Sequence, residues 1–238
     1  MEREFICGDC MNYLPTYPDN YFDIAVVDPP YGLKMHGGKD FSGYVKQKNG
    51  EMLFVAGGKY KNRGWDNATP PTDYFKELFR VSKQQIIFGV NYFNFPMPGG
   101  RIIWDKCNDN SNQSDAEIAY CSLQNRVDIF RYMWRGMLQG KNIHEGWIQQ
   151  GNKKLNEKRI HPTQKPVNLY RWICQNYIQK GWKVLDTHVG SASSLIAYEE
   201  NGLEYVGFEI DKEYYSAAKK RLEEFRMQIS IFDLIGFN

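Results

Sequence analysis

A carboxylate, two prolines and an aromatic ring stand together directly after a short apolar run. The run Asp23–Val27 has the composition of a buried strand, and Asp28, Pro29, Pro30 and Tyr31 follow it. Prolines lack the backbone N–H that a sheet ladder needs, so the strand must end here. In open α/β sheets, ligands bind beyond the carboxyl ends of the strands. The tetrapeptide is therefore a candidate catalytic motif, and a strand-ending turn with a packed tyrosine is the alternative.

These groups suit chemistry on the exocyclic amino group of a nucleobase. The lone pair of such a nitrogen is delocalised into the ring, so the nitrogen is a poor nucleophile. The carboxylate of Asp28 and a fixed carbonyl of Pro29 would accept both N–H bonds, localise the lone pair and orient it toward a methyl group. The ring of Tyr31 would stack on an extruded base, an interaction worth about 1–3 kcal/mol.

A second group of candidate residues lies near the C-terminus, where a strand, a small-residue turn, a helix and a second strand follow one another. The first strand ends at Asp186, the turn contains Gly190 and Ser191, and the second strand ends at Glu209, 23 positions after Asp186. In a βαβ unit this spacing brings an acidic side chain to the tip of the second strand, where it can accept hydrogen bonds from ribose hydroxyls. An ordinary βα turn with a surface glutamate is the alternative.

Charge is distributed unevenly along a chain whose formal net charge is only +2. Residues 33–64 carry seven basic and two acidic side chains, and residues 131–165 carry eight basic and two acidic ones, so the remainder is acidic. Aromatic residues are interleaved in both segments, and this mixture suits phosphate contact and base stacking. Both segments therefore indicate a polyanionic partner, with two solvated loops as the alternative.

Composition places the chain among ordinary globular proteins. Of its 238 residues, 42% are hydrophobic and 24% are charged, which argues against intrinsic disorder. Its apolar runs are too short to span a membrane, and the N-terminus lacks the apolar stretch of a signal peptide. The five cysteines are expected to be reduced thiols in a cytoplasmic protein. Cys7 and Cys10 have no second pair to complete a metal site, so we expect no metal. Because the apolar runs are short, we also expect no membrane partner.

The elements that must position these motifs are predicted to be strands alternating with helices. Apolar spacing predicts helices near residues 74–81, 169–177 and 215–225, the last with Asp211 as its N-cap. Short β-branched runs predict strands at residues 5–7, 24–27, 86–89, 101–104, 118–121, 184–186 and 205–208. The alternation favours an α/β fold with a mostly parallel sheet. The Gly- and Lys-rich segment 32–64 is predicted to be a long, mobile basic loop.

At these motifs the chain resembles the DNA amino-methyltransferases that use S-adenosylmethionine. Asp28-Pro29-Pro30-Tyr31 precedes His161-Pro162-Thr163-Gln164-Lys165-Pro166, which precedes the turn Asp186–Ser191, and this order is that of the permuted β class. The opening Ile6–Cys10 is also similar to that class. The resemblance covers nearly the whole chain. It implies a Rossmann-like methyltransferase fold with a mostly parallel seven-stranded sheet, one antiparallel strand and a circularly permuted motif order.

The resemblance also implies the domain organisation and the roles of the motif residues. Residues 1–238 would form a single catalytic domain, with 131–160 as a short target-recognition segment. The motif from Asp28 to Tyr31, including Pro29 and Pro30, would be catalytic: Asp28 and the Pro29 carbonyl would hold the target amino group, and Tyr31 would stack on the flipped base. S-adenosylmethionine would be bound by Asp9, Cys10, Asp28, Thr163, Gln164, Lys165, Asp186, Gly190, Ser191 and Glu209.

Within that set, the resemblance assigns different parts of the cofactor to different residues. Asp9 and Cys10 would border its adenine, and Glu209 would bind the ribose hydroxyls. Gly190 and Ser191 would line the methionine moiety, with Asp186 nearby. The residues Thr163, Gln164 and Lys165 would close over the cofactor, with Lys165 near its carboxylate.

The cofactor turn departs from the family pattern Asp-Pro-Phe-x-Gly-Ser-Gly-Thr. Thr187 replaces Pro, His188 replaces Phe, Ala192 replaces the second Gly and Ser193 replaces Thr. A methyl group at Ala192 penalises a positive φ and crowds a ligand, which puts the cofactor affinity in question. We interpret His188 as a polar replacement for a packing aromatic, and His161 as a structural residue before its proline.

The implied activity is methylation of the exocyclic N6 of adenine in DNA. Aspartate before Pro-Pro-Tyr is more usual in adenine enzymes of this family, whereas N4-cytosine enzymes commonly carry serine there. An N4-cytosine methyltransferase and a catalytically weak nucleic-acid-binding relative are the alternatives. DNA is the expected partner. Because residues 131–160 are short for target recognition, we expect recognition to be shared with residues 33–64 or with a second copy in a homodimer.

Overall fold

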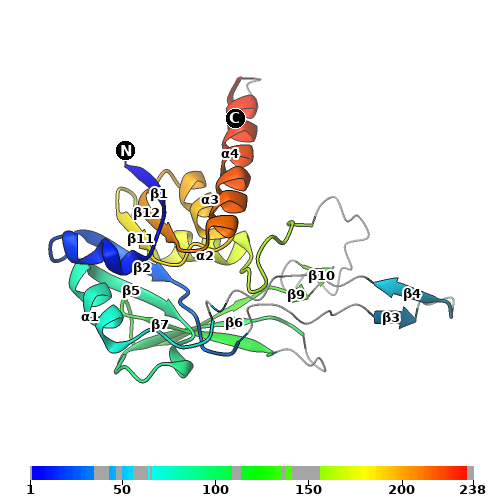
Figure 1. Cartoon of the computed structure of the whole chain (residues 1–238), viewed down its shortest axis with the longest axis horizontal. Helices are drawn as coiled ribbons and strands as arrows, with labels where there is room; N and C mark the ends of the chain where they lie inside the picture. Colours follow the sequence, from blue (N-terminus) through cyan, green and yellow to red (C-terminus); the bar gives the residue numbers. More distant parts are fainter. Residues whose placement is uncertain are drawn as a thin grey trace.

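The structure is a computed structural model that describes residues 2–34, 43–46, 50–55, 64, 66–108, 114–135, 138–140 and 156–234. Its main feature is an eight-stranded sheet (Figure 1). In spatial order the strands are β1 (Arg3–Cys7), β12 (Glu204–Glu209), β11 (Lys183–Asp186), β2 (Phe22–Val27), β5 (Ser82–Phe88), β7 (Ala116–Cys121), β6 (Gly100–Asp105) and β8 (Val127–Arg131). The sheet is mostly parallel, as predicted, because only β7 runs antiparallel to its neighbours.

The sheet has one strand more than the seven expected. The additional strand is β8, which pairs in parallel with β6 at the edge of the sheet. Its exposure alternates, with Val127 and Ile129 exposed and Asp128 and Phe130 half-buried. An edge strand that is only half covered lacks the continuous apolar run by which the buried parallel strands were recognised.

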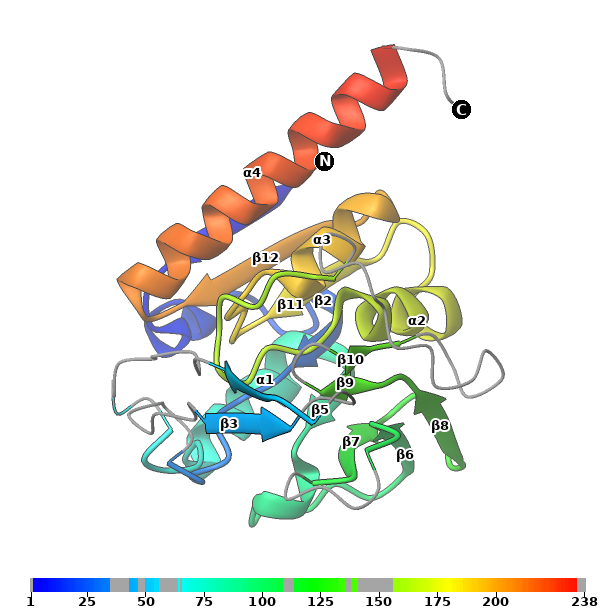
Figure 2. The same ribbon diagram turned by 90° about the vertical axis from the view of Figure 1, so that its right-hand side faces the viewer.

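Helices cover both faces of the sheet, and successive residues of each central strand serve the two layers alternately. Ile24 and Val26 of β2 pack in one core with α2 (Val167–Tyr177), α3 (Ser193–Glu200) and α4 (Lys212–Leu234). Ala25 and Val27 pack in the other core, with α1 (Thr72–Val81) and the 3₁₀ turns η1 (Cys10–Asn12) and η2 (Leu14–Thr16). Figure 2 shows α2, α3 and α4 grouped together beside β11 and β12.

The helix boundaries follow local chemistry. Helices α1 and α2 start directly after Pro71 and Pro166, whose extended backbone conformation ends the preceding segment. Helix α4 starts where the carboxylate of Asp211 accepts the N–H groups of Glu213 and Tyr214, so the predicted cap is confirmed. The helix is longer than predicted, since it continues past Phe225 to Leu234.

The chain crosses the sheet in two opposite directions from its centre. From β11 the chain passes through α3 to β12 on one side, and from β2 it passes through α1 to β5 on the other. Helix α3 and helix α1 lie on opposite faces. The carboxyl ends of the adjacent strands β11 and β2 therefore flank a topological switch point, the usual place for a ligand in such sheets.

Two small hairpins lie outside the sheet. One joins β3 (Gly43–Lys46) to β4 (Met52–Val55), and the other joins β9 (Trp134–Arg135) to β10 (Leu138–Gln139). In Figure 1 the β3–β4 hairpin points away from the sheet. The predicted mobility of residues 32–64 and the recognition role of 131–160 concern segments that fall largely outside the described residues. Among the helices in the described ranges, none has the length and apolar character of a membrane span.

Candidate active site at the ends of β2, β11 and β12

The candidate catalytic motif, residues 28–31, lies where β2 ends. Strand β2 is buried through Val27, and the next two residues are Asp28 and a buried Pro29. Strand β2 pairs with β11 in the register Leu185↔Ala25, so the ends of the two strands lie side by side. This places Asp28 at the switch point, as the sequence predicts for a candidate catalytic residue.

The Asp28 carboxylate is held by two side chains. Its Oδ1 accepts a hydrogen bond from the Tyr31 hydroxyl at 2.5 Å, and its Oδ2 lies 2.5 Å from the ammonium nitrogen of Lys165. The Asp28 side chain is 17% exposed, whereas that of Lys165 is only 3% exposed. The lysine expected over the cofactor thus makes its ion pair with the catalytic motif.

Lys165 also joins Asp28 to a second carboxylate, which the sequence reasoning missed. Its ammonium nitrogen lies 2.9 Å from Oε2 of Glu117, and Oε1 of Glu117 lies 2.7 Å from the ammonium nitrogen of Lys106. Burial opposes the charge of Glu117, yet Lys165 and Lys106 lower its pKa to about 2. The available signal was topological: an antiparallel strand starts at the edge where its parallel neighbours end, so the beginning of β7 lies beside the catalytic motif.

The ring of Tyr31 has an aromatic neighbour on one face. It stacks on Tyr92 with ring centroids 5.0 Å apart and planes inclined by 15°, and Tyr92 is 40% exposed. Gly89, at φ +74°, makes this position possible, because a β-carbon there would come within 2.1 Å of the Tyr31 ring. A stack of two tyrosines beyond the carboxyl end of β2 is a surface suited to a flat base.

The turn after β11 is organised around the buried carboxylate of Asp186. Its Oδ1 accepts the N–H of His188 at 3.0 Å, and its Oδ2 accepts the Ser194 hydroxyl at 2.5 Å. Burial outweighs these hydrogen bonds and raises the pKa of Asp186 to about 7. Gly190 and Ala192 both have positive φ, +56° and +61°. The expected strain at Ala192 is therefore present in the turn.

Glu209 ties the end of β12 to that turn. Its Oε2 accepts the N–H of Gly190 at 2.9 Å, and its Oε1 accepts the N–H of Asp211 at 2.8 Å. Burial raises the pKa of Glu209 to about 7. Asp9 and Cys10 lie just past the end of the adjacent strand β1, since Cys7 pairs with Glu209 and the N–H of Gly8 is bonded to the Glu209 carbonyl. The sequence-predicted residues around Glu209 are thus brought together.

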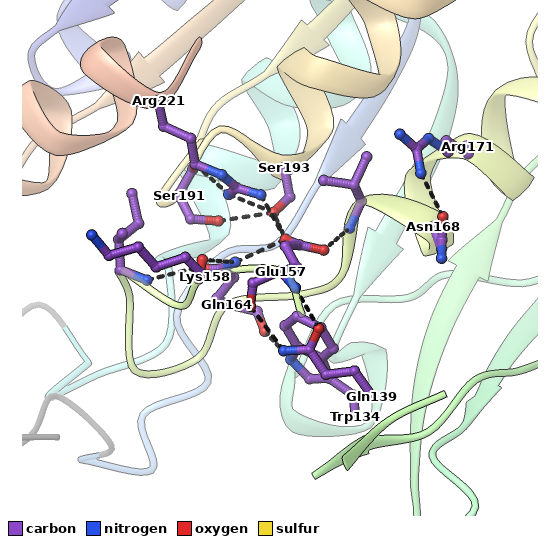
Figure 3. A network of polar contacts seen from close by, with 12 residues as sticks. Trp134, Gln139, Glu157, Lys158, Gln164, Asn168, Arg171, Ser191, Ser193 and Arg221 are labelled. Carbon is purple, nitrogen blue, oxygen red and sulfur yellow. Dashed lines mark hydrogen bonds and ion pairs between the residues drawn. The ribbon is translucent and has the colours of Figure 1, made fainter. Parts of the chain in front are cut away.

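Thr163 and Gln164 are placed differently from Lys165. Thr163 is exposed, whereas Gln164 is buried and donates to the carboxylate of Glu157. Glu157 is the centre of the network in Figure 3, where it also receives Arg221 at 2.6 Å and the backbone N–H of α2 at Val167. The side chain of Gln164 therefore braces its own loop from within.

The same network reaches the cofactor turn through Arg221 of α4. Its guanidinium donates to the carbonyl of Ser191 and to the hydroxyl of Ser193 (Figure 3). Ser191 and Ser193 are also joined to each other through their hydroxyls at 3.0 Å. Arg221 consequently ties the turn after β11 to helix α4.

A comparison with protein families shows which group of proteins shares this arrangement. The model of the DNA methylase family matches residues 22–220, a range that contains the motif at β2 and the turn at β11. The chain belongs to this family. It is accordingly an S-adenosylmethionine-dependent DNA methyltransferase of the N6/N4 type, which confirms the predicted class.

Individual proteins agree with this assignment. YubD of Escherichia coli (strain K12), which carries the name of a methylase, is 26% identical over 235 residues, or 92% of this chain and 89% of YubD. The structure of M1.HpyAVI in complex with S-adenosylmethionine superposes with a TM-score of 0.54 and 16% identity over 92% of this chain and 98% of that one. The cytosine-N4-specific PvuII methyltransferase superposes with a TM-score of 0.52 and 11% identity over 96% and 93%. The two structural likenesses show the fold.

The methyltransferase fits a ribose-bearing cofactor at Glu209. A carboxylate offers about four acceptor positions, and backbone N–H groups take one position on each oxygen of Glu209. The remaining positions suit a pair of hydroxyl donors. Gly190, at φ +56°, presents backbone beside this carboxylate. The residues present are therefore compatible with the cofactor, with Ala192 as the strained member of the turn.

The two histidines near the turn are packed and neutral. Burial lowers the pKa of His161 to about 3, and its ring packs edge-on against Tyr214. Burial lowers the pKa of His188 to about 4, and its ring packs edge-on against Tyr74. These placements support a structural interpretation of both residues.

The cysteines of the methyltransferase are free thiols. Cys10 is buried, and burial, with a smaller contribution from Asp9, raises its thiol pKa to about 12. Within the ranges that the structure describes, no group of three or more His, Cys, Asp or Glu side chains is arranged to hold a metal ion.

Proposed function

We propose that this methyltransferase transfers a methyl group to the N6 amino group of adenine in a base turned out of DNA. The observation that carries the proposal is the placement of Asp28, followed by Pro29, at the end of β2 beside the turn that follows β11. Aspartate at this position is the form typical of adenine enzymes in the family that the sequence resembles.

In the proposed reaction the side chains of the motif hold the amino group. Asp28 and the Pro29 carbonyl accept its two N–H bonds, and Tyr31 stacks on the base. S-adenosylmethionine supplies an electrophilic methyl group when bound. As the amino nitrogen accepts that methyl group, Asp28 would take up the proton that the nitrogen releases.

The proposed cofactor contacts extend across the ends of β1, β11 and β12. Glu209 receives the ribose hydroxyls, and Asp9 and Cys10 border the adenine. Gly190 and Ser191 line the methionine moiety beside Asp186, with Asp28 at its methyl end. Thr163 and Gln164 belong to the loop on the other side of the site, and Lys165 of the same loop is held by Asp28 instead. Support comes from the hydrogen bond between Gly190 and Glu209, and from the influence of Asp28 on the pKa of Asp186.

We propose that the basic segment 32–64, together with 131–160, contacts DNA. The β3–β4 hairpin within it pairs Tyr44 directly with Phe54, and the two rings lie 5.3 Å apart while 68% and 54% of these residues are exposed. Exposed aromatics flanked by lysines suit base stacking with phosphate contact. Deleting residues 36–60 should abolish DNA binding while sparing cofactor binding. Unchanged DNA affinity would shift recognition to a second copy of the chain.

The deciding experiment is methylation of DNA with labelled cofactor, followed by mass spectrometry of the nucleosides. The expected product is N6-methyladenine. N4-methylcytosine as the sole product would overturn the adenine assignment in favour of the cytosine alternative. Sequencing of DNA methylated in a methylation-free host would then define the recognition sequence.

A weakly catalytic, nucleic-acid-binding relative is the second candidate, and Ala192 favours it. A non-glycine residue at φ +61° costs about 1–2 kcal/mol, which weakens the turn that must meet the cofactor. Calorimetry with S-adenosylmethionine separates the two candidates. Tight binding with turnover removes this one, and DNA binding without detectable cofactor binding supports it.

A further inference from the structure

The ammonium group of Lys165 is enclosed at the catalytic motif. It lies 2.5 Å from Asp28, 2.9 Å from Glu117 and 3.0 Å from the hydroxyl of Tyr31. The ring of Phe88 lies 4.8 Å from the same nitrogen. Because only 3% of the Lys165 side chain is exposed, the ammonium group is confined to this position beside Asp28.

Glu117 holds this lysine and is held in turn by another one. Each of its oxygens has its own cation: Oε2 contacts Lys165 at 2.9 Å and Oε1 contacts Lys106 at 2.7 Å. The four groups Asp28, Glu117, Lys165 and Lys106 carry two negative and two positive charges. A buried cluster is tolerated when its charges are paired in this way, and removing one member leaves another uncompensated.

The arrangement has a direct consequence for the carboxylate that receives the target amino group. A buried carboxylate near no cation binds a proton and then cannot accept two N–H bonds from the substrate. Lys165 favours the charged form of Asp28. Glu117 shares the charge of Lys165 and so leaves Asp28 more basic than a full lysine charge would.

Several other titratable groups face Asp28 from the elements around it. Tyr31 donates to it from its own loop. Asp186 of β11, Tyr170 of α2 and Tyr74 of α1 all respond to its charge. Burial raises the pKa of both Tyr170 and Tyr74 well above the usual value, so these two hydroxyls stay neutral at the pH of an assay. Lys165 contacts Asp28 directly, and Glu117 contacts Lys165.

We propose that Lys165 and Glu117 are positioning residues for methyl transfer: Lys165 fixes one oxygen of Asp28, and Glu117 fixes Lys165 and balances its charge. This role depends on the proposed function, in which Asp28 receives the amino group. It gives the HPTQKP lysine a partner on the antiparallel strand β7 in place of a contact with the cofactor.

The test is the pH dependence of kcat in two variants, with total methyl transfer to DNA as the readout for either base. Lys165→Met removes the cation, so the acid limb of the profile should move to higher pH by about one unit. Glu117→Gln leaves Lys165 facing Asp28 alone, so the acid limb should move to lower pH. Both variants should lose about 10- to 100-fold in kcat at pH 8, with the cofactor Kd unchanged.

A matched control is available at the far end of β11. Lys183 and Glu2 form another lysine–glutamate pair at 2.6 Å, and Lys183→Met should leave the pH profile as it is in the wild type. The proposal is overturned if the acid limb of the kcat profile stays in place, or if it moves in the same direction in both variants. A loss of cofactor binding in Lys165→Met also overturns it, since that result assigns Lys165 to the cofactor. Should Lys165→Met fail to fold, the direction of the Glu117→Gln limb decides alone.

Failure of the proposed function is recognised separately. In that case the nucleosides from DNA treated with the wild-type protein contain N4-methylcytosine only, or no methylated nucleoside at all. Failure of the positioning role instead gives an active wild type whose profile is insensitive to Lys165 and Glu117.

Discussion

The two ends of the candidate site bury carboxylates in different ways. The end around Asp28 and Tyr31, where the target base is proposed to bind, is called the base end. There Glu117 is paired with two lysines, and its pKa falls to about 2. At the cofactor end, Asp186 and Glu209 receive only backbone N–H groups and a hydroxyl, and burial raises the pKa of each to about 7. Burial alone therefore favours the neutral acid, and two lysines within 3 Å of Glu117 reverse this preference.

Asp28 lies at the same end as Glu117, but its pKa shifts in the opposite direction. Burial keeps its pKa above the usual value even though Lys165 opposes this, because Glu117 adds negative charge nearby. Asp28 thus shares one lysine with Glu117, whereas Glu117 has a lysine on each of its oxygens.

The largest expected effect is at Asp28. Replacement by Asn or Ala should lower kcat about a thousandfold, because the acceptor for the amino group is lost, while the cofactor Kd changes only modestly. Steady-state methylation and calorimetry with S-adenosylmethionine give the two values. Asp23→Asn, at the opposite end of β2, is the matched control and should keep its activity. Equal losses of activity and cofactor affinity at Asp28 would erase the distinction between the two ends.

Glu209→Gln should show the reverse behaviour. Losing a charged acceptor for ribose hydroxyls should weaken cofactor binding about 10- to 100-fold with a small change in kcat at saturation. Calorimetry at pH 8 measures it, and Glu204→Gln at the start of the same strand is the control. A cofactor Kd that matches the wild type would remove Glu209 from the site.

Cofactor binding should also depend on pH in a direction set by this acid. In the free protein Glu209 has a pKa of about 7, so affinity should rise as the pH increases from 6 to 8 and the carboxylate loses its proton. His161 and His188, with pKa values of about 3 and 4, stay neutral across this window. The pKa of Asp186 is also about 7, so Asp186→Asn shows how much of the pH dependence of cofactor binding comes from Asp186 rather than from Glu209. An affinity that is flat in the wild type would contradict the charged role of Glu209.

Stability should respond to Asp186 in a related way. Its pKa of about 7 in the folded protein exceeds the ordinary value of 3.8. Protonated Asp186 therefore adds to the free energy of unfolding at low pH, and this contribution is lost as the pH rises toward 7. The two buried histidines act in the opposite sense, because the unfolded chain binds their protons below pH 6.5. The free energy of unfolding of Asp186→Asn should therefore rise more steeply from pH 5 to 7 than that of the wild type. Denaturant titrations without cofactor measure both, and parallel curves would exclude the effect.

The smallest expected effect is at Ala192. Replacement by Gly should stabilise the protein by about 0.5–1 kcal/mol, since a strained φ of +61° is relieved while glycine adds backbone entropy to the unfolded chain. Cofactor affinity should stay equal or increase. Ala197→Gly, inside α3, should instead destabilise the protein and serves as the control. A destabilised Ala192→Gly would show that the methyl group packs usefully in the turn.

The local motifs could be predicted from the order of residues alone. Two prolines had to end β2 after Asp28, and the interval from Asp186 to Glu209 had to place an acid at the tip of the following strand. The parallel α/β sheet followed from the alternation of apolar runs and helical spacing. These inferences succeed because each depends on the conformation of a few neighbouring residues.

Which charged side chains meet at the site depends on how the whole chain packs. Tyr31 and Lys165 are 134 positions apart, and Tyr31 and Glu117 are 86 apart, yet their side chains are in contact. No local pattern marks Glu117, because its position depends on the insertion of β7 between β5 and β6 with its start at the site edge. Strand order and direction, which arise from the packing of the whole sheet, set the electrostatics of the base end.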